Sequence, residues 1–303
     1  MNNFIQYELW KDCRNNCVFC FNKKQPDLDK IISLNHVISK LDEEEVSNFN
    51  EVGFIGGEFF DNQLEDLKVK ELWDKLFNKV LNMMDEGKFV KLYFTTSLLF
   101  KDLKYINEFL DLIKARGHLN KTLLCTSYDV IGRFHTSELL ELWKHNMKTI
   151  HEKYPELMLH TEIIMTGAFI DSVLKNKFDI NSFKQEYSTD VDYLQPNAGY
   201  YYKTKEEFNS VLPNFFPKRS EFIKFMKKTI IDDKTIDPNR IFNRNLQSDT
   251  VYIYVNSKEI KVQNRRKALA PLPCDMIKKS GYIDSDIPMK TDVDNLRMEI
   301  IDA

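Results

Sequence analysis

The sequence predicts an α/β fold with a parallel sheet. Two observations predict it: short stretches rich in Val, Ile, Phe, Tyr and Thr recur along the first two thirds of the chain, and amphipathic helical patterns lie between them. Such short apolar stretches are typical of buried parallel strands. Because parallel neighbours are joined by right-handed crossovers, this alternation is compatible with an open doubly wound sheet and with a barrel.

Six stretches are expected to form strands. They are residues 4–9, 51–55, 90–95, 122–127, 158–165 and 192–195. Three helices are expected between them, because apolar residues recur at helical spacing. Their apolar positions are Leu72, Leu76, Phe77, Val80 and Met84; Leu103, Ile106, Phe109, Leu110 and Ile113; and Leu139, Leu140, Trp143, Met147 and Ile150. Gly117 is expected to cap the second helix and Pro155 to follow the end of the third. These positions are interpreted as core.

The composition is that of a globular enzyme. The 303 residues are 43% hydrophobic and 29% charged, and the net charge of −3 predicts no general affinity for polyanions. No apolar run approaches the roughly 18 residues of a membrane span. The N-terminus lacks the features of a signal peptide, and five cysteines, three of them in one motif, argue against a disulfide framework. We therefore expect a cytoplasmic protein in a reducing compartment.

Three cysteines follow the first expected strand, in the loop at its carboxyl end. Cys13, Cys17 and Cys20 have the close spacing of thiolates that bind zinc or an iron–sulfur cluster. Structural zinc takes four ligands, and the next candidate, His36, fits no common zinc spacing. A cubane cluster held by three cysteines leaves one iron open to an exchangeable ligand. Structural zinc and unpaired structural cysteines are the alternatives.

The segment Cys13-Arg14-Asn15-Asn16-Cys17-Val18-Phe19-Cys20 resembles the C-x3-C-x-aromatic-C motif of the radical S-adenosylmethionine (radical SAM) enzymes, with Phe19 at the aromatic position. The resemblance implies a 4Fe-4S cluster bound by the three cysteines. Its open iron would chelate S-adenosylmethionine (AdoMet), and an electron from a flavodoxin- or ferredoxin-like donor would generate a 5′-deoxyadenosyl radical. It also implies a partial (β/α)6 TIM-type barrel over residues 1–205.

A glycine-rich segment follows the second expected strand. Gly56-Gly57-Glu58 combines two glycines, which let a backbone approach a ligand closely, with a carboxylate that can accept hydrogen bonds from an ammonium group. Taken alone, it is equally a glycine turn with a surface Glu. It resembles the GGE motif that holds the AdoMet amino group in the radical SAM family, and it lies one βα unit after the cysteines.

Polar residues also follow the third and fourth expected strands. Thr96 is a candidate cofactor contact, since hydroxyls at strand ends can bind a ribose or a carboxylate. By resemblance, Ser127 and Asp129 are expected at the ribose. Arg133 is expected at the methionyl carboxylate, with a surface arginine or a salt bridge at a helix start as the alternative. Gln195 and Asn197 at the sixth strand face the cofactor or substrate, or cap the loop.

Two cysteines lie outside the motif. Cys125 is interpreted as a small buried residue of the fourth strand, with a hydrogen-atom donor as the alternative. Cys274 is alone in the C-terminal part, which argues against an auxiliary cluster and so weakens the interpretation as a peptide-modifying enzyme.

Residues 206–303 are expected to form a C-terminal extension. It contains a helix around Phe222 and Met226, a hairpin of residues 251–255 and 259–262, and a tail in which Arg265-Arg266 is a candidate for binding a phosphate or nucleic acid. The extension is expected to cover the barrel opening and contact substrate, with a docked, purely structural appendage as the alternative.

The sequence therefore predicts a radical SAM enzyme acting on a nucleotide or nucleic acid, a peptide or a small metabolite. The alternative is a binding module stabilised by zinc or a cluster, without AdoMet turnover.

Overall fold

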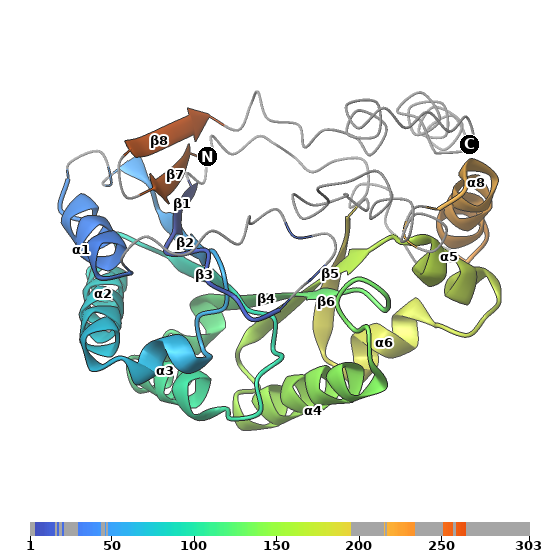
Figure 1. The fold of residues 1–303 in the computed structure, drawn as a ribbon, viewed down its shortest axis with the longest axis horizontal. Coiled ribbons are helices and arrows are strands. Elements are labelled where there is room, and N and C mark those ends of the chain that lie inside the picture. The colour runs from blue at the N-terminus through green and yellow to red at the C-terminus, as the bar shows by residue number, and fades with distance from the viewer. Residues whose placement is uncertain are drawn as a thin grey trace.

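The computed structural model describes residues 4–15, 17, 20, 30–43, 46, 48–194, 215, 217–233, 251–256 and 259–264. Its strands form one eight-stranded sheet with the order β6-β5-β4-β3-β2-β1-β7-β8. Strands β1 to β6 run parallel to one another, β7 pairs parallel with β1, and β8 pairs antiparallel with β7. The sheet forms an arc with helices on its convex side (Figure 1), which confirms the predicted α/β partial barrel.

The strands are β1 (Phe4–Glu8), β2 (Glu51–Ile55), β3 (Lys91–Thr95), β4 (Thr122–Tyr128), β5 (Met158–Ile164), β6 (Thr189–Leu194), β7 (Val251–Asn256) and β8 (Glu259–Asn264). All six strands expected in the first part of the chain are therefore confirmed. The sixth begins three residues earlier than predicted, because Asp190 interrupts the apolar pattern in the first half of β6. Their side chains alternate with buried Val191 and Tyr193, as on a strand with only one face against the core.

The helices are α1 (Lys30–Lys40), α2 (Leu67–Asp85), α3 (Lys104–Ala115), α4 (Ser137–Lys153), α5 (Gly167–Leu174), α6 (Ile180–Glu186) and α8 (Arg219–Met226), with the 3-10 turns η2 (Asn62–Glu65) and η3 (Leu119–Lys121). The expected helices are α2, α3 and α4. Gly117 follows α3 with a φ of 71°, as predicted for a C-cap. Among the described helices, α1, α5 and α6 were not predicted; α5 and α6 span only eight and seven residues, too few to show a clear period.

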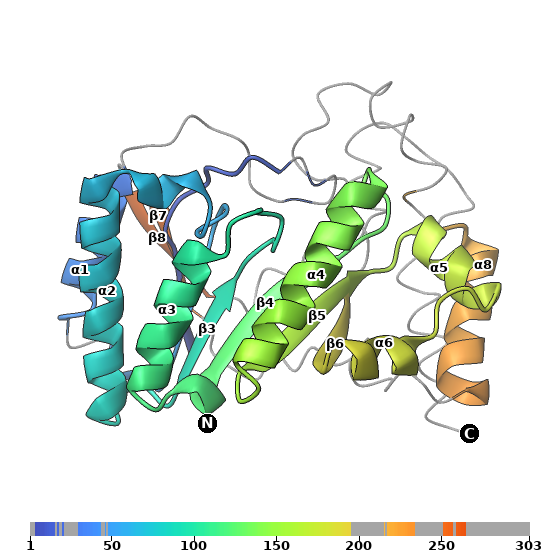
Figure 2. The same cartoon turned by 90° about the horizontal axis from the view of Figure 1, so that it is seen from below.

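The hydrophobic core lies between the convex face of the sheet and the helices. Figure 2 looks onto this helical layer, with α2, α3 and α4 in front of the strands. Phe109 of α3 lies at its centre, with ring centroids 4.6 Å from Phe77 and 5.0 Å from Phe94. Trp143 of α4 is fully buried under Tyr128 and Phe183. The predicted apolar stripes are therefore core, as expected, with Leu72, Leu103, Leu139 and Leu140 at its partly buried margin.

The predicted C-terminal helix and hairpin are both present. Helix α8 continues as a π-helix, η4 (Lys227–Asp232), and β7 and β8 pair antiparallel across residues 257–258. Strand β7 lies parallel to β1, with Ile5 opposite Val251. The hairpin thus occupies the free edge of the first strand, where unpaired backbone N–H and C=O groups need partners. The boundary at residue 205 and the covering of the barrel opening stay predictions. None of the described helices is long and apolar enough to cross a membrane.

Candidate functional site

The candidate site lies at the carboxyl ends of β1 to β4, where a parallel sheet brings successive loops together. Residues 9–20 after β1, the cysteine loop, are described except for 16, 18 and 19. Cys17 is buried and Cys13 and Cys20 are half-buried. The backbone N–H of Cys20 donates to the carbonyl of Cys17 at 3.1 Å, which holds these two cysteines close together.

The three thiols are close enough to influence one another electrostatically. Burial is the main cause that raises the pKa of the Cys13 thiol to about 12, and the charges of Glu58, Cys17 and Cys20 contribute to the same rise. A hydrogen bond from the backbone of Asn15 acts in the opposite direction. Thiolates this close together repel one another. A positively charged metal centre offsets that repulsion, so metal binding favours the thiolate form of the three cysteines.

The cysteine loop runs alongside the glycine segment after β2. The parallel pairing of β1 and β2 continues beyond both strands: Leu9 N–H donates to the Ile55 carbonyl at 3.0 Å, and Gly57 N–H donates to the Trp10 carbonyl at 2.7 Å. Glu58 N–H then donates to the Asp12 carbonyl at 3.1 Å. The position of Gly56-Gly57-Glu58 beside the cysteines is therefore built into the backbone.

The two glycines are required by this close backbone approach. A Cβ at Gly56 would lie 2.2 Å from the Trp10 carbonyl oxygen, and one at Gly57 would lie 1.8 Å from the Asp12 carbonyl oxygen. Gly56 also has a φ of 151°, which L side chains rarely adopt. The sequence suggested that a ligand approaches these glycines; in the structure the backbone that approaches them is that of the cysteine loop.

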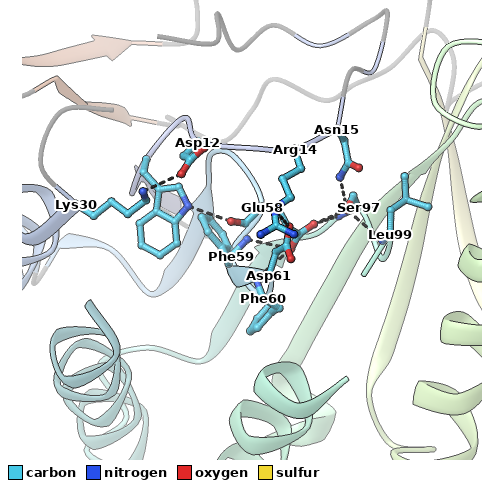
Figure 3. Close-up of polar contacts among 11 residues, drawn as sticks. Asp12, Arg14, Asn15, Lys30, Glu58, Phe59, Phe60, Asp61, Ser97 and Leu99 are labelled. Atoms are coloured by element: carbon cyan, nitrogen blue, oxygen red, sulfur yellow. Dashed lines mark hydrogen bonds and ion pairs between the residues drawn. The ribbon is translucent and has the colours of Figure 1, made fainter. Parts of the chain in front are cut away.

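Glu58 is buried and its carboxylate is surrounded by donors from the chain (Figure 3). Oε1 accepts from the backbone N–H groups of Phe59 at 2.9 Å and Phe60 at 3.2 Å, and from Thr96 Oγ1 at 2.8 Å. Oε2 accepts from the N–H of Ser97 at 2.7 Å and from its hydroxyl at 2.5 Å. The surface-Glu alternative is wrong. Glu58 as an acceptor for an ammonium group stays a prediction, and such a group would compete with five protein donors for about four lone-pair positions.

Further contacts tie the cysteine loop to this carboxylate (Figure 3). Asn15 Nδ2 donates to Ser97 Oγ at 2.9 Å, and Trp10 Nε1 donates to the Glu58 carbonyl at 3.0 Å. Ion pairs join Arg14 to Asp61 at 3.4 Å and Lys30 to Asp12 at 2.8 Å. Sequence reasoning missed Trp10, Asp12, Asn15 and Ser97 as individual contributors; the only signal was that Ser97 belongs to the hydroxyl run at the end of β3.

Arg133 lies beneath the cysteine loop, on the turn after β4. Its side chain is 9% exposed, so the surface alternative is wrong. Nε donates to Cys17 Sγ at 3.4 Å, and Nη1 donates to the Ser127 carbonyl at 2.8 Å. The structure thus places Arg133 against a cysteine of the motif. Its contact with a methionyl carboxylate stays a prediction.

Asp129 is fully buried at the end of β4. Oδ1 accepts from the N–H of Ile131 at 3.1 Å, whereas Oδ2 has no hydrogen-bond partner among the residues that the structure describes. Burial raises the pKa of this carboxyl to about 6, although nearby backbone N–H groups and Arg133 act against the shift. A buried oxygen without a donor is costly, so a ligand hydroxyl would be stabilised there.

The other expected site residues are placed as follows. The Thr96 hydroxyl donates a hydrogen bond to Glu58. Ser127 is half-buried, and its backbone carbonyl accepts a hydrogen bond from Arg133. Cys125 is half-buried on the concave face, in register with Thr95 and His160, and not in the core under the helices. Six of the residues singled out in the sequence lie outside the described part of the chain: Phe19, Gln195, Asn197, Arg265, Arg266 and Cys274.

Among the described residues, no three His, Cys, Asp or Glu side chains lie close enough together to bind a single metal ion. Thiolates of a cubane cluster bind separate irons and are therefore spaced more widely than the ligands of one ion. The donor set of three thiols, with a buried guanidinium beside one of them, fits an iron–sulfur cluster.

No protein-family model matches this sequence, and no curated protein matches it. Solved structures do. Polyhistidine-tagged anSMEcpe with bound AdoMet aligns over 100% of this chain and 99% of that one, with a TM-score of 0.55 and 12% identity. The chain has the fold of the radical SAM enzymes. Native anSMEcpe with bound AdoMet aligns over 80% of this chain, with a TM-score of 0.50 and 15% identity, and this alignment spans 64% of that chain, less than two thirds. In the radical SAM fold of this chain, the cysteine loop and the glycine segment follow β1 and β2.

Proposed function

We propose that this protein is a radical SAM enzyme that binds a 4Fe-4S cluster through Cys13, Cys17 and Cys20. When bound, the cluster would supply the electron that cleaves AdoMet reductively to a 5′-deoxyadenosyl radical, which abstracts hydrogen from a substrate. The observation that carries the proposal is the backbone pairing of Trp10 with Gly57 and of Asp12 with Glu58. It supports the proposal because it brings the three-cysteine loop and the glycine segment together at the carboxyl edge of the sheet.

The protein's own contribution is binding, orientation and exclusion of water. Gly56, Gly57 and Glu58 form the proposed contact to the methionyl amine. Since the Glu58 carboxylate already accepts five hydrogen bonds, we assign the acceptor to a backbone carbonyl of this segment. The Gly57 carbonyl accepts no hydrogen bond from the described residues and is our candidate.

The end of β4 forms the proposed contact to the ribose. Asp129 Oδ2 receives no hydrogen bond from the described part of the chain, and a ribose hydroxyl would satisfy it. Ser127 lies two residues away, and Thr96 supports the site indirectly through Glu58. Phe19 is proposed to lie beside the cofactor, and the electron is proposed to come from an external flavodoxin- or ferredoxin-like donor.

The test is anaerobic reconstitution with iron and sulfide, followed by iron analysis and an AdoMet cleavage assay. The wild-type chain should bind about four irons and release 5′-deoxyadenosine when a strong reductant is added. Cys17→Ala should lose both properties. Cys125→Ala, the matched control outside the motif, should retain the iron content.

Two results would contradict the proposal. If Cys17→Ala keeps wild-type iron content and cleavage, the motif does not bind the cluster. If the wild-type chain binds zinc or a cluster but releases no 5′-deoxyadenosine with either dithionite or a flavodoxin system, the chain is a metal-stabilised binding module.

A further inference from the structure

The guanidinium of Arg133 is held in a fixed position beside Cys17. Nε donates to Cys17 Sγ at 3.4 Å, while Nη1 donates to the Ser127 carbonyl at 2.8 Å and to Thr126 Oγ1 at 3.4 Å. Three acceptors on two segments therefore orient the planar group. Such an orientation is possible for Arg, whose donors form a rigid fork, and not for Lys.

The turn after β4 determines where Arg133 lies. The Asp129 carbonyl accepts from the N–H of Arg133 at 3.3 Å and of Phe134 at 3.0 Å, which closes the turn. The Phe134 ring packs 5.4 Å from Tyr128 and 5.7 Å from Trp143. Because Phe134 is anchored in the core, its neighbour Arg133 is directed back toward the sheet, where its side chain is buried.

The buried guanidinium needs a partner, because a buried cation is costly unless it is paired. Cys17 Sγ, which accepts from Arg133 Nε at 3.4 Å, lies in position to be that partner. Once Cys17 is bound to a metal centre as a thiolate, the contact pairs opposite charges as well as making a hydrogen bond.

We propose that Arg133 sets the reduction potential of the cluster through its N–H···S hydrogen bond and its positive charge. The inference rests on the proposed function, since it needs a cluster bound at Cys17. One electron from an external donor makes the cluster and its three thiolates more negative by one charge, with no bond formed or broken. A buried cation next to one of these thiolates stabilises the reduced state more than the oxidised state. Hydrogen bonds to the sulfurs act in the same direction.

This role differs from that of a methionyl carboxylate ligand. A ligand to AdoMet affects AdoMet binding and has no effect on the cluster in its absence. A potential-setting residue affects the cluster before AdoMet is added. The decisive measurement is therefore the midpoint potential without AdoMet.

The experiment compares reconstituted wild type, Arg133→Gln and Arg133→Lys by anaerobic potentiometric titration, with the reduced cluster detected by electron paramagnetic resonance. Arg133→Gln should lower the equilibrium constant for reduction at least tenfold, which is about 59 mV for a one-electron couple. Arg133→Lys, which keeps the charge and loses the fork, should give an intermediate potential. Arg116→Gln, the matched control at the end of α3, should keep the wild-type potential.

The signal arises only from loaded molecules, so partial iron occupancy does not distort the potential. A wild-type potential in both Arg133 variants would overturn the proposal, whether or not AdoMet affinity falls. Failure of both variants to bind any cluster would also overturn it, because Arg133 would then be needed for assembly. If the wild-type chain itself binds no cluster, the proposed function fails.

Discussion

Ser97 contacts one oxygen of Glu58 twice, through its backbone N–H at 2.7 Å and through its hydroxyl at 2.5 Å. The same hydroxyl accepts a hydrogen bond from Asn15 of the cysteine loop. The end of β3 thus connects the carboxylate after β2 with the loop after β1. This connection makes Glu58 a structural support of the cysteine loop, in addition to any contact with a cofactor.

Substitution of Glu58 should destabilise the protein strongly. Glu58→Ala removes the acceptor of three buried backbone N–H groups and two hydroxyls, and leaving buried donors unsatisfied costs about 1–3 kcal/mol each when water cannot reach them. We expect the free energy of unfolding to fall by at least about 3 kcal/mol in urea denaturation. Glu65→Ala, on the exposed part of η2, is the control and should stay within about 0.5 kcal/mol of wild type. A Glu58→Ala protein as stable as this control would refute the structural role.

Substitution of Gly57 should displace the cysteine loop. In Gly57→Ala the new Cβ would collide with the Asp12 backbone, so the pairing between the two loops must open. We expect the iron bound after reconstitution to fall to less than half of wild type. The matched control is Gly87→Ala, where a Cβ meets no atom within 4 Å and only the positive φ carries a cost of about 1 kcal/mol. Equal iron content in the two variants would show that the close approach at Gly57 is dispensable.

The buried carboxyl of Asp129 should make stability depend on pH. Its pKa is about 6 in the folded chain, against about 3.9 in an unfolded one, so the folded state holds the proton more tightly. The stability that this proton confers is complete below about pH 4 and is lost as the pH rises through 6. Relative to Asp129→Asn, which does not titrate, the wild-type apo-protein should lose about 2–3 kcal/mol between pH 4 and pH 7.5. Urea denaturation at both pH values measures the difference, and a constant gap between the two proteins would contradict the assignment.

The aromatic core between α2, α3 and the sheet should be sensitive to Phe109. Its ring contacts Phe60, Trp73, Phe77 and Phe94. Phe109→Ala leaves a cavity among these rings and should reduce the free energy of unfolding by about 3–5 kcal/mol. Leu67→Ala, at an 83% exposed position, is the control and should change it by less than about 0.5 kcal/mol. Thermal or urea denaturation that finds the two variants equal would contradict the packing described.

Much of the fold was predictable from local patterns. Strand β2 has the predicted bounds, and the apolar stripes of α2, α3 and α4 are core, because period and composition are encoded within a few neighbouring residues. The candidate site was predictable in part, since the cysteine and glycine segments are short motifs in a fixed order. Helix α5 was missed because its apolar stripe is only two turns long.

The order of the βα units, the faces of the main helices and the positions of the two motifs follow from local sequence patterns. The contacts of these residues depend on the three-dimensional arrangement of the chain. Glu58 meets Ser97 across 39 residues, Arg133 meets Cys17 across 116, and β7 joins β1 at the edge of the sheet. The physical reason is that local patterns encode secondary structure, whereas partners for a buried carboxylate, a buried guanidinium and an open strand edge are provided by whichever segments the sheet brings together.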